Sequence, residues 1–80
     1  MTLFEKMGYD KETCETLNYA RRHTGLKNTT LVILHENTKA GNNEFLEKVN
    51  DFVINKCKSV EEANNFIQEN NPIVIKELAN

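Results

Sequence analysis

The chain contains one strongly apolar run, Thr30-Leu31-Val32-Ile33-Leu34-His35. The run includes β-branched residues, which are enriched in strands. It would also be apolar on both faces of an extended backbone, which suits a strand at the centre of a covered sheet. We therefore expect a central β-strand here, and residues 37–43 break its pattern.

The stretch before this run, residues 9–24, supports two interpretations. As a helix it would be capped by Asp10 and ended by Gly25. As a strand it would alternate through residues 15–22 and form a hairpin with the apolar run. Two strands alone are only marginally stable in water, and a third strand helps greatly. This argument favours the strand.

Helical periodicity begins at residue 43. Phe45, Val49 and Phe52 are spaced by four and three residues, and a second apolar row carries Leu46, Val53 and Cys57. The resulting stripe is wide enough to cover one face of a sheet. Asn42 or Asn43 can cap this helix at its start.

Two capping boxes and one proline set further boundaries. Thr2-Leu3-Phe4-Glu5 and Ser59-Val60-Glu61-Glu62 both have the S/T-x-x-E pattern that begins a helix. The helix that begins after Ser59 extends to residue 70, because Pro72 prevents a simple continuation. Residues 73–75 are again apolar, and residues 73–78 predict a last strand, with the proline at its first position.

These elements predict one α+β domain over residues 1–80, in the order α-β-β-α-α-β. It would be a small two-layer fold, with a three-stranded sheet covered by helices on one face. If residues 9–24 are helical, the order becomes α-α-β-α-α-β.

Composition excludes several classes of function. The ten basic and twelve acidic residues give a net charge of −2, and the only basic cluster is Arg21-Arg22-His23. The longest apolar run, residues 31–34, is far shorter than the ~20 residues that cross a bilayer. The start of the chain shows no signal peptide, and two widely spaced cysteines predict reduced thiols. We expect a cytoplasmic protein that does not bind membranes.

The residues that carry chemistry are scattered along the chain. The zinc-ligand candidates are Cys14, His23, His35 and Cys57, and no two of them lie within eight positions of each other. Zinc sites usually take ligands in close pairs, so we expect no metal. Ser59 is used as a helix cap, and the glycines do not form a phosphate loop. The sequence predicts neither a cofactor nor an enzyme.

Because the sequence shows no reactive centre, its polar surface residues predict a binding function. The expected partner contacts are Arg21, Arg22 and His23 on the hairpin, and Asn64, Asn65 and Gln68 on the last helix. A protein partner fits the uncharged amides, because the cores of interfaces are depleted of charge. The alternative is a nucleic-acid-binding accessory domain that uses Arg21 and Arg22. A third hypothesis is a homodimer that completes its sheet through residues 73–78.

The opening Leu3-Phe4-Glu5-Lys6-Met7-Gly8-Tyr9 resembles the start of small α/β proteins carried by phages of low-GC bacteria. In those proteins a short helix that ends at Gly-Tyr leads into a hairpin. The resemblance covers about a tenth of the chain and transfers no functional residues. It implies a phage or mobile-element accessory protein that modulates, and in particular inhibits, a host enzyme or defence system.

Overall fold

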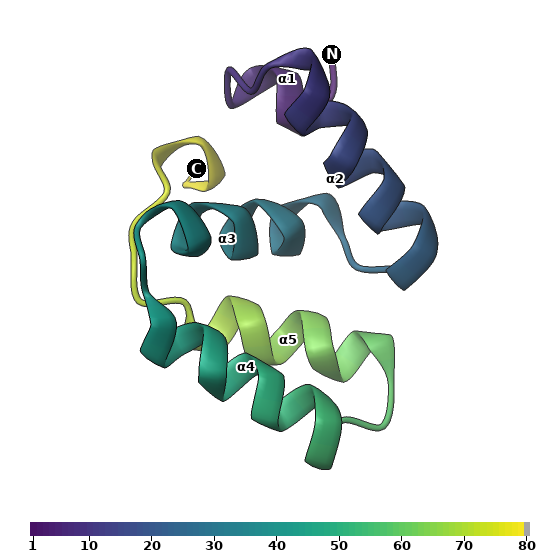
Figure 1. The fold of residues 1–80 in the computed structure, drawn as a ribbon, viewed down its shortest axis with the longest axis vertical. Helices are drawn as coiled ribbons and strands as arrows, with labels where there is room; N and C mark the ends of the chain where they lie inside the picture. Colours follow the sequence, from purple (N-terminus) through teal and green to yellow (C-terminus); the bar gives the residue numbers. More distant parts are fainter. Residues whose placement is uncertain (80) are drawn as a thin grey trace.

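The structure is a computed structural model that describes residues 1–79. Its elements are the helices α1 (Leu3–Lys6), α2 (Lys11–Thr24), α3 (Asn28–Lys39), α4 (Asn43–Asn55) and α5 (Val60–Asn70), followed by the 3₁₀ turn η1 (Lys76–Leu78). Helix α3 crosses the middle of the molecule (Figure 1). The α1–α2 pair lies on one side of it, and the α4–α5 pair lies on the other.

The apolar run forms the central helix α3, so the predicted central strand is wrong. Leu31, Val32 and Ile33 are all buried, although they point in three directions around the helix axis. A helix that is apolar on every side is stable where it has partners on every side, and here both helix pairs supply them. A short apolar run has the same pattern in a buried strand and in a buried helix.

Residues 11–24 also form a helix, so the favoured strand and its hairpin are wrong. The alternative interpretation named both ends of α2 correctly. Asp10 Oδ1 accepts a hydrogen bond from the Thr13 amide at 2.8 Å. Gly25 ends the helix with a φ of 76°, a left-handed conformation that glycine adopts without strain.

Residues 71–79 contain no strand either. After Pro72 the chain runs past one end of α3 and closes in the turn η1 (Figure 1). Ile75 is buried in the core, and the Asn71 Nδ2 donates to the Ile73 carbonyl at 2.8 Å. Because residues 1–79 contain helices and no strand, the predicted α+β fold with a three-stranded sheet is wrong. The predicted homodimer would need residues 73–78 to form a strand, and the structure has none there.

The predicted helices α1, α4 and α5 are confirmed. Thr2 and Glu5 form the complete capping box of α1. Ser59 Oγ accepts from the Glu62 amide at 3.1 Å, while the Glu62 carboxylate accepts from the Lys58 amide at 3.0 Å. Asn42 holds the N-cap position of α4, but its side chain bonds to Asn37 and not to the helix.

Buried amides join α3 to α5 near the start of α3. Asn64 Oδ1 accepts from the Thr30 hydroxyl at 2.6 Å and from the Lys27 amide at 3.0 Å. Gln68 Nε2 donates to Thr30 Oγ1 at 3.2 Å. Thr30 and Asn64 are both buried, so these bonds replace the water that the polar groups lose on folding.

A second amide cluster holds the other end of α3. Asn37 Nδ2 donates to the Ile33 carbonyl at 2.8 Å and to Asn71 Oδ1 at 2.9 Å. Asn37 Oδ1 accepts from Asn42 Nδ2 at 2.8 Å. This fully buried residue therefore connects α3, the turn before α4 and the segment after α5. The two clusters determine how α3 sits on the α4–α5 pair.

We predict that Asn64→Ala lowers the free energy of unfolding by about 2 kcal/mol, because it leaves the Lys27 amide and the Thr30 hydroxyl without their acceptor. Asn65→Ala, on the exposed side of the same helix, should change it by less than about 0.5 kcal/mol. Urea unfolding followed by circular dichroism measures both values. Equal effects of the two substitutions would contradict the structural role of Asn64.

Candidate functional site

An apolar groove of about 430 Å³ lies where α3, α4 and α5 meet the loop after α2. Its deepest residues, Val49, Ala63 and Ile67, are buried, whereas Val53 and Val60 at its edge are 47% and 45% exposed. Most of its surface is hydrocarbon. The lining consists of Thr24, Leu26, Leu34, Val49, Val53, Cys57, Ser59, Val60, Ala63 and Ile67.

The groove exists because the apolar stripe of α4 is wider than the surface that its neighbours cover. Phe45 and Val49 are buried in the core, and the Phe52 ring stacks on the Phe66 ring of α5 at 4.1 Å. The second row, which includes Val53 and Cys57, is left to line the groove. The spacing of apolar residues predicted this row, but the sheet that it was expected to cover is absent from residues 1–79.

Further apolar surface adjoins the groove. Ile54, next to Val53 on α4, is 69% exposed. Single exposed apolar residues are common on proteins, but contiguous apolar patches mark interaction sites. Val53 and Val60 extend the apolar lining onto the surface of the molecule, and Ile54 follows Val53 in the chain.

The polar groups in the groove are bound to the protein's own backbone. Thr24 Oγ1 donates to the Ala20 carbonyl at 2.7 Å, and Cys57 Sγ donates to the Ser59 carbonyl at 2.9 Å. The Ser59 hydroxyl accepts from the Glu62 amide as the α5 cap. The groove therefore offers apolar contact more than reactive groups.

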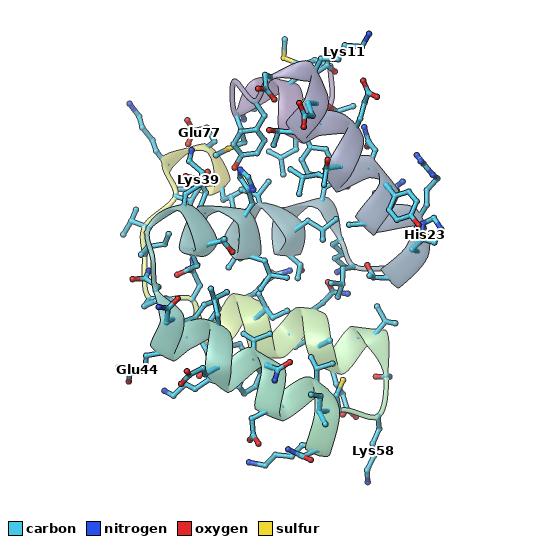
Figure 2. The ribbon with its side chains drawn as sticks, in the orientation of Figure 1. Lys11, His23, Lys39, Glu44, Lys58 and Glu77 are labelled. Carbon is cyan, nitrogen blue, oxygen red and sulfur yellow. The ribbon has the colours of Figure 1, made fainter. Side chains whose placement is uncertain are left out.

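Within the predicted basic cluster, Arg21 lies one helical turn before the groove residue Thr24, whereas Arg22 lines a separate hollow with Glu15 and Tyr19. Arg21, Arg22 and His23 are all exposed in the last turn of α2, immediately before the groove residue Thr24. The His23 ring stacks on the Tyr19 ring at 3.8 Å, and its Nδ1 lies 2.9 Å from the Tyr19 carbonyl. Figure 2 shows His23 at the outer end of α2 and Lys58 on the loop between α4 and α5.

The predicted amide contacts are not gathered on one outer face. Asn65 is exposed, but Asn64 is only 4% exposed and bonds to Lys27 and Thr30. Gln68 is exposed and donates to Thr29 and Thr30. In this structure Asn64 and Gln68 join α5 to α3. The signal that identifies such a role is helical position, because Asn64 lies one residue from Ala63 and three from Ile67 on the buried side.

The candidate metal ligands do not converge. Among residues 1–79, no three histidine, cysteine or acidic residues are placed to hold a metal ion. Cys14 Sγ lies 3.5 Å from the Tyr9 carbonyl, Cys57 lines the groove, and His35 packs edge-on against the Tyr9 ring. Both cysteines are free thiols.

One ionisable pair has clearly perturbed pKa values. The Tyr9 hydroxyl donates to Glu36 Oε2 at 2.6 Å, and Lys39 Nζ lies 3.4 Å from the same oxygen. Partial burial and the neighbouring carboxylate raise the pKa of Tyr9. The hydrogen bond from Tyr9 lowers the pKa of Glu36 below its ordinary value of 4.5. The pair joins the turn before α2 to α3.

In comparisons with known proteins, no family model, curated protein or solved structure matches the chain. Among residues 1–79, no helix has both the length and the apolar character needed to cross a membrane.

We predict that Tyr9→Phe lowers the free energy of unfolding by about 1 kcal/mol near pH 7, because Glu36 loses its hydrogen-bond donor. The loss should shrink below pH 4.5, as Glu36 becomes protonated in the original protein and the charge-assisted bond weakens. It should also shrink above about pH 10, where the unfolded state binds fewer protons than folded Tyr9.

Urea unfolding of both proteins at about pH 3 and about pH 7 measures how far the loss in free energy of unfolding shrinks in acid. Tyr19→Phe is the matched control, because Tyr19 is more than half exposed. A Tyr9→Phe effect that is independent of pH would show that the bond to Glu36 contributes nothing to stability.

Proposed function

We propose that this chain is a small, non-enzymatic protein-binding domain whose interface is the apolar groove between α3, α4 and α5. The observation that carries the proposal is the half-exposed apolar edge formed by Val53 and Val60. Covering this edge would remove hydrocarbon surface from water, and each Å² buried would stabilise the complex by about 25 cal/mol. Burial of this kind is the main favourable contribution to most protein association.

The polar groups of the groove support binding over catalysis. The Thr24 hydroxyl and the Cys57 thiol donate to backbone carbonyls, and the Ser59 hydroxyl caps α5. A nucleophile needs an adjacent base or a lowered pKa, and these three groups are instead engaged in holding helix ends. The groove is therefore better suited to recognising a partner than to transforming a substrate.

The class of partner follows from the N-terminal resemblance. A phage or mobile-element origin would make the partner a host enzyme or defence protein, which the domain modulates by occupying part of its surface. The exposed arginines Arg21 and Arg22 also keep nucleic-acid binding as the alternative, with the half-exposed Tyr19 beside them as an aromatic surface.

We predict that Val53→Lys abolishes capture of host proteins in a pull-down from lysate, because a charge in the groove must lose water on binding. The matched control is Val74→Lys, which makes the same chemical change at a 92% exposed residue outside the groove. Mass spectrometry should identify proteins that the original chain and Val74→Lys retain and that Val53→Lys loses. Circular dichroism confirms that both variants are folded.

The same set of proteins retained by all three forms, or none retained by any, would contradict the groove as the interface. A gel shift at low salt that is lost in Arg21→Ala/Arg22→Ala and kept in Val53→Lys would favour the nucleic-acid alternative.

A further inference from the structure

We infer that the groove takes an amphipathic α-helix of a partner protein, and that this helix carries acidic residues at the end that lies beside the loop between α2 and α3. The inference rests on the proposed function and names the chemistry of its partner. It follows from the hydrogen bonding of the groove and from the charges at its edge.

The occupant is helical because the groove has few free groups that could form hydrogen bonds with a peptide backbone. Its hydroxyls and thiol are bound to the protein's own helix ends, and its remaining lining is hydrocarbon. An extended segment would bury amide and carbonyl groups there without partners, at a cost of about 1–3 kcal/mol for each group. A helix satisfies these groups internally and presents apolar side chains at i, i+3, i+4 and i+7.

The described residues offer no sheet edge to which a partner strand could add. All regular elements of residues 1–79 are helices, so they present no sheet edge to an extended peptide. The groove is instead bounded by three helices, with Leu34 on α3, Val53 on α4 and Val60 on α5. Side chains from one face of an incoming helix can enter between them.

The acidic end of the occupant follows from charge complementarity. Residues 16–35 contain no aspartate or glutamate, but they contain Arg21, Arg22 and Lys27. All three basic residues are exposed, and the groove residues Thr24 and Leu26 lie between them in the chain. Arg21 and Lys27 therefore bring positive charge to this end of the groove on a chain whose net charge is −2, whereas Arg22 lines a separate hollow with Glu15.

Acidic residues near the groove do not cancel this charge. On the α4 side, Asp51 pairs with Lys56 at 3.8 Å. On the α5 side, the Glu62 carboxylate accepts from the Lys58 amide, and Glu61 is the remaining exposed acidic residue beside Val60. Complementary charges of this kind select partners and accelerate their association.

A second copy of the chain is a poorer occupant. The buried residues of α3, α4 and α5 already pack against each other in the core. On α4 a second copy would offer the exposed residues Val53 and Ile54, and the acidic residue closest to them in the chain, Asp51, is paired with Lys56. Self-association is therefore the competing outcome in the experiment.

The test is selection from a display library of amphipathic helices. The apolar positions vary among Leu, Ile, Phe and Met, and the polar positions of both end turns are fully randomised. The baits are the original chain, Arg21→Glu/Lys27→Glu, Val53→Lys, and the control Lys11→Glu/Lys76→Glu. The control makes the same charge change at exposed lysines outside the groove, and Figure 2 places Lys11 at the far end of α2.

We expect the original chain and the control to enrich helices with Asp or Glu in one end turn. These helices should bind Arg21→Glu/Lys27→Glu roughly tenfold more weakly, and that variant should itself enrich Lys or Arg at the same end. Val53→Lys should bind none of them. The acidic preference should also fall as salt concentration rises.

The other outcomes separate this inference from the proposed function. Helices that lose binding to Val53→Lys but show no charge bias would overturn the acidic end and leave the groove as an interface. Helices that bind Val53→Lys equally, or a library that yields none, would overturn the helical occupant. Sedimentation that shows a dimer lost in Val53→Lys would assign the groove to a second copy and overturn the inference.

Discussion

The fold depends on the burial of α3 on all its sides. Leu31, Val32 and Ile33 project in different directions, so no single neighbouring layer can cover them. The α1–α2 pair covers one side, the α4–α5 pair covers another, and the C-terminal segment adds the buried Ile75 (Figure 1). A central helix of this kind also buries polar side chains, which must find partners within the protein.

Asparagine meets this need at both ends of α3. Near the start of the helix, Asn64 Oδ1 accepts a hydrogen bond from the Thr30 hydroxyl. Near its end, the Asn37 side chain is hydrogen-bonded to the side chains of Asn71 and Asn42. Hydrogen bonds are directional, whereas apolar contacts are not. These amides therefore set the position of α3 along the α4–α5 pair. That position leaves Leu34 and Val53 facing the groove, so the core geometry and the candidate interface have one origin.

Local signals in the sequence located the helix ends well, although those of residues 11–24 belonged to the interpretation that was not favoured. Thr2, Asp10, Ser59 and Gly25 act through neighbours within a few residues, so their roles can be identified without the tertiary structure. The state of residues 30–35 was predicted wrongly, because β-branched residues favour strands only weakly and tertiary packing decides. The burial of Asn64 was missed for the same reason, since its partners Lys27 and Thr30 are 37 and 34 positions away. The sequence predicted two features near the groove, the apolar row with Val53 and Cys57 and the nearby arginines. It did not predict that α3, α4 and α5 leave a groove between them.

The most direct test of this account is the Cα chemical shift of residues 30–35 in solution, measured by NMR on isotopically labelled protein. The sign of the deviation from random-coil values distinguishes helical from extended backbone at each residue. A buried central helix predicts downfield deviations at all six positions. Upfield deviations at Leu31–Leu34 would show an extended segment, and would remove both the core and the groove wall described above.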